Sequence, residues 1–265
     1  MWKILFLFVF YSYNVFAYIP PTEFILKTLA KKHEGAVGLF IKHTVSSYND
    51  NKPTGISFTE NIFVYNQNRV VWCAIKDAQD NLLYFDEHKS NSLFMLLFDD
   101  SLIHLKKFLE THGIIIPTSE EQQKSFLARF KNNVAWVIGE KTKQLSSQLW
   151  IEKDVFLPFK IQYSKNEEWF TFGFEGFRFY KEFPYPTQIN LTQLNNEKES
   201  SLYEIKLKEI QVFHEQKAFF LLKEKLFGKT SPHHVLPYSL TVEGKKLDSK
   251  LIRTIEDYYK KINLL

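Results

Sequence analysis

Residues 147–194, SQLWIEKDVFLPFKIQYSKNEEWFTFGFEGFRFYKEFPYPTQINLTQL, predict four successive β-strands. The first two, at 148–152 and 158–163, alternate apolar and polar residues, which is the period of a strand with one buried face. The third has an almost wholly aromatic face, made by Phe170, Phe172 and Phe174. Strands with so many rings on one side predict an antiparallel meander that curves around an apolar concave face.

On the second strand, Phe159 and Tyr163 are expected to share one face.

The alternation of apolar and polar residues has one interruption in this stretch. After the third strand the alternation shifts by one residue at Gly176, so that Phe177 continues the apolar series out of phase. Glycine at such a shift indicates a bulge or a sharp bend. The alternation resumes in a fourth strand at 185–194.

Several residues of the same stretch resemble the LolA-like family of periplasmic lipoprotein carriers. The family pattern is a short strand with Trp or an aliphatic residue, an acidic turn, Leu-Pro before a second strand, and a later Phe-Pro before another strand. The matching residues are Trp150, Asp154, Leu157, Pro158, Phe183 and Pro184. The resemblance implies an α+β fold in which helices cover the concave face of an antiparallel half-barrel sheet. It also implies a carrier that is not an enzyme.

The N-terminus has the pattern of a secretory signal peptide. Lys3 precedes an apolar run at residues 4–10, and a more polar segment leads to Ala17 at a small-residue cleavage position. The apolar run is too short to span a bilayer, which takes about 20 helical residues. We therefore expect residues 1–17 to be a signal peptide and residues 18–265 to form one domain in the periplasm. An uncleaved membrane anchor is the alternative.

The rest of the chain predicts further strands and helices around this sheet. From the turn signals and apolar periods, strands are expected at 36–46, 54–65, 69–76, 81–85, 134–139, 201–213 and, in an apolar segment, 218–222. Helices are expected at 22–32, at 92–112 with a break near Asp99-Asp100, at 118–132 after a capping box of Thr118 and Glu121, and at 249–263. Helices inserted between strands at 92–132 can lie across the open side of the sheet.

The sequence contains no recognised catalytic, phosphate-binding or metal-binding motif. The one histidine pair, His233-His234, lacks an indicated third ligand, so we predict no metal and no cofactor. The single cysteine, Cys73, lies in an apolar run and is expected to be a buried thiol. The net charge is +4, with Lys and Glu mixed along the chain, which argues against nucleic-acid binding.

Aromatic residues make up 17% of the chain, more than an ordinary β core needs, and this favours a binding surface. The resemblance implies that this surface is a hydrophobic cavity, which would be lined by Trp150, Phe170, Phe172, Phe174, Phe177, Leu96 and Leu97. Its ligand would be a lipid or lipoprotein acyl chain, and the resemblance implies membrane-associated donor or acceptor proteins as partners. The alternative is a structural or interaction protein of the cell envelope, with a solid core.

In the resembling family, an arginine in the cavity holds the closed lid by hydrogen bonds. The candidates in this chain are Arg69, Arg129 and Arg178. None of them lies in a matching motif, so the resemblance assigns the role to none.

Overall fold

The structure is a computed structural model that describes residues 19–67, 69–76, 82–89, 93–116, 125–130, 133–140, 145–165, 167–195, 198–227, 241–242, 245–246 and 249–262. The expected signal peptide and the histidine pair therefore lie outside the described residues. So do residues 117–124, which hold the expected capping box.

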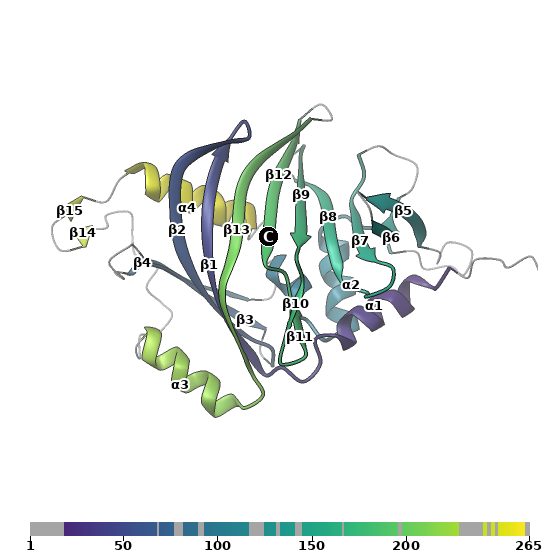
Figure 1. Cartoon of the computed structure of the whole chain (residues 1–265), viewed down its shortest axis with the longest axis horizontal. Helices are drawn as coiled ribbons and strands as arrows, with labels where there is room; N and C mark the ends of the chain where they lie inside the picture. Colours follow the sequence, from purple (N-terminus) through teal and green to yellow (C-terminus); the bar gives the residue numbers. More distant parts are fainter. Residues whose placement is uncertain are drawn as a thin grey trace, which may run out of the picture.

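One open antiparallel sheet of 11 strands organises the chain, in the order β4-β3-β2-β1-β13-β12-β9-β8-β7-β6-β5 (Figure 1). The strands are β1 (Gly38–Asn49), β2 (Lys52–Tyr65), β3 (Val70–Lys76), β4 (Leu82–Lys89), β5 (Phe126–Phe130), β6 (Asn133–Gly139), β7 (Gln148–Glu152), β8 (Pro158–Lys165), β9 (Glu168–Glu175), β12 (Gln188–Asn195) and β13 (Lys198–Phe213). Two small hairpins stand apart from it, β10 (Arg178–Tyr180) with β11 (Phe183–Tyr185) and β14 (Thr241–Val242) with β15 (Lys245–Lys246). Register shifts, including one at Lys42/His43 and one at Trp150/Ile151, bend the strands as bulges do.

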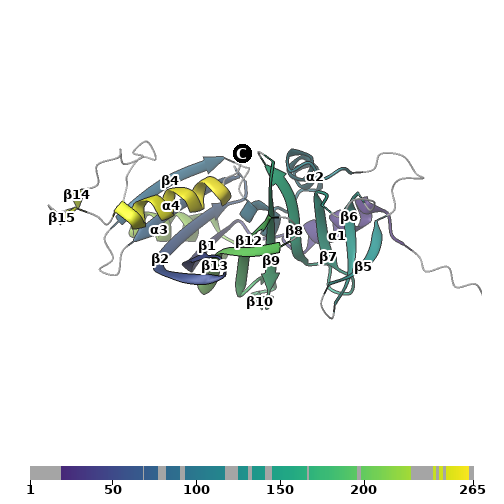
Figure 2. The same ribbon diagram turned by 90° about the horizontal axis from the view of Figure 1, so that it is seen from above.

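The helices lie on both faces of the sheet. They are α1 (Thr22–Lys31), the 3-10 helix η1 (Leu93–Leu97), α2 (Leu102–Thr111), α3 (Gln216–Phe227) and α4 (Ser249–Ile262). One continuous core joins α1, η1, α2 and α4 to what we call the inner face of the sheet, and Figure 2 shows α2 and α4 on the same side. The opposite, outer face carries α3 over β1–β3. The predicted α+β class, open antiparallel sheet and covering helices are confirmed.

A buried polar group fastens α4 to the inner face. The Glu60 carboxylate on β2 is fully buried and accepts hydrogen bonds from the hydroxyls of Tyr258, at 3.0 Å, and Tyr259. His43 on β1 lies 3.6 Å from the same carboxylate and contacts the Tyr185 hydroxyl at 3.2 Å. Burial raises the pKa of the Tyr258 phenol, and the negative charge of Glu60 raises it further. Two hydrogen bonds from one helix to one buried carboxylate determine where α4 sits.

Most predicted elements are confirmed within a few residues, and two are wrong. Residues 126–130 form β5 rather than the end of a helix, because Phe126, Ala128 and Phe130 turn one way and Leu127, 40% exposed, turns the other. Residues 218–222 belong to helix α3 rather than a strand, because Phe219 inserts fully into the outer core while Leu221 faces solvent.

The aromatic stretch itself is divided more finely than predicted. Beyond β9 the chain bends at Gly176, whose φ of +65° favours glycine, and a Cβ there would lie 2.2 Å from the Thr187 hydroxyl oxygen. Phe177 therefore leaves the sheet, and the β10–β11 hairpin intervenes before β12. The expected fourth strand is accordingly split into β11 and β12.

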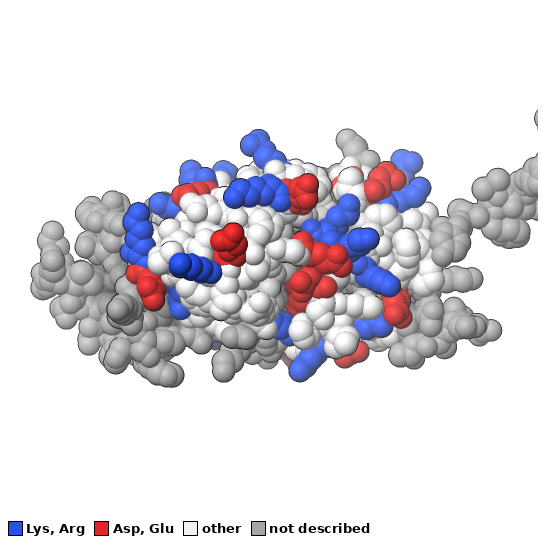
Figure 3. Space-filling model, turned by 90° about the horizontal axis from the view of Figure 1, so that it is seen from below, with Lys and Arg blue, Asp and Glu red and all other residues white. Residues whose placement is uncertain are grey.

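Charged side chains of both signs are interspersed over the face seen in Figure 3, with uncharged areas between them. In the part of the chain that the structure describes, no helix is both long and apolar enough to cross a bilayer. Cys73 is buried, as predicted.

Candidate functional site

The inner face brings together all the predicted cavity residues except Trp150. Phe170, Phe172 and Phe174 project from β9 and are at most 4% exposed, and Leu96 and Leu97 of η1 are buried in the same core. Phe177 is partly buried and packs against that core from beyond the end of β9. Contact of these residues with a ligand stays a prediction.

Trp150 lies on the outer face. Its neighbours Leu149 and Ile151 belong to the inner core, so the alternation along β7 turns the Trp150 ring the other way. A register shift at Trp150/Ile151 also turns Phe159 outward, although it was expected beside Tyr163. The ring centroids of Trp150 and Phe159 lie 6.3 Å apart, in an outer cluster separate from the inner core. A bulge of this kind leaves no clear sequence signal, because one extra residue reverses the face of the strand before it.

Tyr163 places a polar atom inside the inner core. Its ring stacks on Phe172, with centroids 6.2 Å apart, and meets His112 of the α2 C-terminus edge-on. The residue is 2% exposed, and its hydroxyl has no hydrogen-bond partner among the described residues. Burial raises the pKa of this phenol above its ordinary value. Leaving a buried hydroxyl unpaired costs about 1–3 kcal/mol, so a missing partner needs an explanation.

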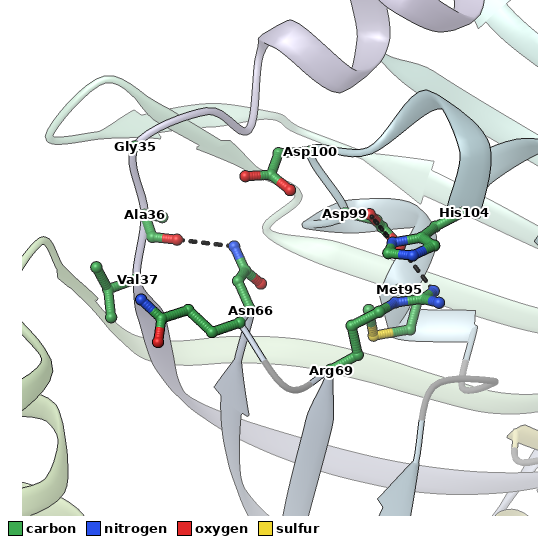
Figure 4. A pocket seen from close by; sticks show the side chains of 10 residues that line it. Gly35, Ala36, Val37, Asn66, Arg69, Met95, Asp99, Asp100 and His104 are labelled. Carbon is green, nitrogen blue, oxygen red and sulfur yellow. Dashed lines mark hydrogen bonds and ion pairs between the residues drawn. The ribbon is translucent and has the colours of Figure 1, made fainter.

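A polar pocket of about 370 Å³ lies where the helices meet the sheet (Figure 4). It is formed by the connection from α1 to β1, the β2–β3 turn and the segment between η1 and α2. Arg69 from the turn and Asp99 from the helical segment form an ion pair of 2.7 Å between Nη2 and Oδ2. His104 on α2 lies 3.5 Å from the other Asp99 oxygen. The pocket is therefore the junction at which charged side chains tie η1 and α2 to the sheet.

Local hydrogen bonds hold Asp99 in place for this contact. The Ser101 backbone amide donates to Asp99 Oδ1 at 2.9 Å, and the Ser101 hydroxyl accepts from the His104 amide as the N-cap of α2. The break predicted near Asp99-Asp100 and the role of these residues at a helix start are confirmed. Burial raises the pKa of the Asp100 carboxyl, and the negative charge of Asp99 adds to the effect.

His33, at the end of α1, joins the same junction. It is fully buried against Phe183, with ring centroids 5.3 Å apart, and its Nδ1 lies 3.4 Å from the Asp99 carbonyl oxygen. Burial lowers the pKa of this imidazole to about 4, although the contact with Asp99 acts in the opposite direction. The sequence analysis did not identify His33 as part of this junction. It named Arg69 only as one of three candidate arginines, because no local pattern links Arg69 with Asp99.

The described residues contain no group of three or more His, Cys, Asp or Glu side chains suited to a metal ion. Of the other two candidate arginines, Arg178 is exposed on β10 and Arg129 lies on β5, and neither lines this pocket.

Comparison with known proteins finds similarity in structure only. No family model and no curated protein matches the chain. The structure is similar to a LolA superfamily protein from Nitrosomonas europaea, with 10% identity, a TM-score of 0.49, and coverage of 76% of this chain and 97% of the other. It is also similar to an outer membrane lipoprotein-sorting protein domain from Vibrio parahaemolyticus, with 10% identity, a TM-score of 0.45, and coverage of 77% and 97%. The first of these proteins carries the name of the superfamily that residues 147–194 resemble.

Proposed function

We propose that this protein is a non-enzymatic periplasmic carrier that binds an acyl chain of a lipid or lipoprotein. The chain would lie between the inner face of the sheet and the helical cover, by which we mean α1, η1 and α2. The observation that carries the proposal is the Tyr163 hydroxyl, which is buried without a partner among apolar rings. The carbonyl oxygen of an acyl ester would supply the missing acceptor.

Burial of hydrocarbon supplies the binding energy. Each CH₂ removed from water is worth about 0.8 kcal/mol, so a chain of about a dozen carbons can be held without a charged contact. The helical cover contacts the sheet mainly through apolar side chains such as Leu96, Leu97 and Leu109, which an acyl chain can replace as neighbours. Entry requires the cover to move, and the Arg69–Asp99 ion pair is a polar contact between the cover and the sheet.

Close packing of the same rings favours a second candidate. Phe170 and Phe172 are each 2% exposed, as in a core filled by the protein's own side chains. On this alternative the protein is a structural or interaction protein of the cell envelope, and partners bind its surface.

A neutral fluorescent ester separates the two candidates. Dansyl-labelled undecanoate methyl ester carries no charge, so its binding reports on the apolar core. We expect saturable binding by the purified protein, faster uptake by Asp99→Asn, and about fivefold weaker binding by Tyr163→Phe. Leu221→Ala, on the exposed side of α3, is the matched control and should behave as the unmodified chain.

Native mass spectrometry supplies the second measurement. Co-purifying lipid, released on unfolding, supports the carrier. A bare mass, together with no ester binding by either the unmodified protein or Asp99→Asn, would overturn the carrier proposal and leave the solid core.

A further inference from the structure

A groove of about 600 Å³ lies on the outer face, on the side of the sheet opposite the inner core. Its floor is made by β9 and β12, and its aromatic walls include Phe130, Phe159 and Phe179. Phe177, which packs against the inner core from beyond the end of β9, also borders the groove. Phe179 is 61% exposed, so apolar surface continues from the groove to the solvent. This volume lies within the range of small-molecule sites, roughly 300–1,000 Å³.

Lys160 brings a charge into this groove. The side chain is only 9% exposed, and its ammonium lies 5.2 Å from the Phe130 ring centroid and 5.4 Å from that of Trp150. No ion pair or hydrogen bond of this ammonium occurs among the described residues. Burial lowers the pKa of the Lys160 amine, and the negative charge of Glu199 partly offsets the effect. Lysine is almost never buried this far without a partner, since desolvating the charge is costly.

Two hydroxyl groups in the groove also lack partners. Thr171 on β9 and Thr192 on β12 are cross-strand neighbours, and neither Oγ1 has a hydrogen-bond partner among the described residues. Thr171 is 5% exposed, so water does not readily replace the missing partner. Three polar groups from neighbouring strands thus face the same space, and the described residues make no hydrogen bond to the two hydroxyl oxygens.

Gly173 leaves room for a ligand between these donors. It pairs with Lys160 on one side and Asn190 on the other, and it sits two residues from Thr171. A Cβ added there would meet no atom within 4 Å. The floor of the groove is therefore open where a head group would reach Lys160.

We propose that the outer groove binds an amphiphile whose head group is an oxyanion, a phosphate or a carboxylate, held by Lys160, Thr171 and Thr192, with its apolar chain against the aromatic walls. An oxyanion accepts from all three donors, and a charge-assisted bond to a desolvated lysine is stronger than one to a solvated lysine. Glu152, Glu175 and Glu199 also line the groove, and as carboxylates they disfavour ligands with several negative charges. A single anionic group on a hydrocarbon chain fits this charge pattern.

The test compares four probes by isothermal titration calorimetry: dodecyl phosphate, dodecanoate, dodecanol and inorganic phosphate. The two anionic amphiphiles are used below their micelle concentrations and dodecanol below its solubility limit. We expect either anionic amphiphile to bind at least tenfold more tightly than dodecanol or inorganic phosphate. Dodecyl phosphate against dodecanoate distinguishes a phosphate head group from a carboxylate. Equal affinity for dodecanol and both anionic amphiphiles would overturn the proposal.

Variants locate the binding. Lys160→Met keeps the apolar stem and should reduce the ratio of affinities, anionic amphiphile to dodecanol, to about one. Lys208 is an exposed lysine of β13, and Lys208→Met should leave this ratio, the preference, unchanged. Gly173→Leu should weaken binding of the anionic amphiphile at least tenfold, and Gly173→Ala should weaken it less. Tyr163→Phe, in the inner core, should not change the preference, which separates this groove from the proposed acyl site. An unchanged preference in Lys160→Met would contradict the assignment.

Discussion

Tyr258 and Glu60 are 198 residues apart in the sequence, yet the Tyr258 hydroxyl donates a 3.0 Å hydrogen bond to the Glu60 carboxylate inside the core. The contact joins the last helix of the chain to the second strand of the sheet. Both residues are fully buried, so water cannot substitute for either partner.

Removing the Tyr258 hydroxyl should loosen α4. Tyr258→Phe deletes one hydrogen bond to a buried carboxyl group and is expected to lower the free energy of unfolding by about 1–3 kcal/mol. Urea denaturation measures the change. Tyr48→Phe is the matched control, because the Tyr48 hydroxyl contacts Glu204 at 3.3 Å on a part-exposed site, and its effect should be under about 0.5 kcal/mol. Equal losses from both variants would show that burial does not strengthen the Glu60 contact.

Acid should destabilise the protein through His33. Its folded pKa of about 4 lies below the ordinary histidine value of 6.5, so the unfolded chain binds the proton more readily. The contribution of neutral His33 to the free energy of unfolding is therefore fully present above pH 6.5 and is lost as the pH falls toward 4. Between pH 7 and pH 5 this amounts to about 2 kcal/mol of unfolding free energy. Urea midpoints at the two pH values measure it.

The control variants isolate His33 from the other histidines. His33→Phe should remove this component of the pH dependence, even if it lowers stability at pH 7 by losing the contact with Asp99. His214→Gln, at an exposed position, should retain the full dependence. A pH dependence that survives in His33→Phe would assign the effect to another group.

The Arg69–Asp99 ion pair should hold the helical cover on the sheet. Asp99→Asn leaves Arg69 without its carboxylate, and breaking a largely buried pair costs about 3–5 kcal/mol. Hydrogen exchange should quicken in the amides of η1 and α2, while β8 and β9 keep their protection. Lys106→Gln breaks the exposed contact of α2 with Glu23 and should cost under about 1 kcal/mol without changing exchange in η1. Uniform loss of protection across the sheet would mean that Asp99 acts on the whole fold.

Two glycines in strands should differ sharply when a methyl group is added. At Gly38 a Cβ would lie 2.5 Å from the Phe219 ring and 2.9 Å from the Val64 carbonyl oxygen, whereas at Gly173 it would meet nothing within 4 Å. Gly38→Ala is therefore expected to cost about 1–3 kcal/mol and to displace α3. Gly173→Ala should be neutral or stabilising by up to about 1 kcal/mol. Thermal unfolding compares them, and similar melting temperatures would contradict the packing at Gly38.

Sequence patterns predicted those elements whose signal is local. The aromatic face of β9 and the amphipathic α4 follow directly from side-chain periods of two and of three to four. The same reasoning failed at residues 126–130, where Phe126, Leu127 and Phe130 fit a helical stripe as well as a strand, and only pairing with β6 selects the strand. Short apolar segments carry too few residues to distinguish the two periods.

The sequence by itself determined that most of this chain would be antiparallel sheet with one aromatic face, because the period of two depends only on neighbouring residues. Tertiary structure alone decided which face each ring occupies, placing Trp150 and Lys160 outside and Tyr163 inside. It also decided which distant charges meet, as at Arg69 and Asp99. A single bulge reverses the side of a strand, and an ion pair between remote loops depends on the path of the whole sheet, so neither has a local signature.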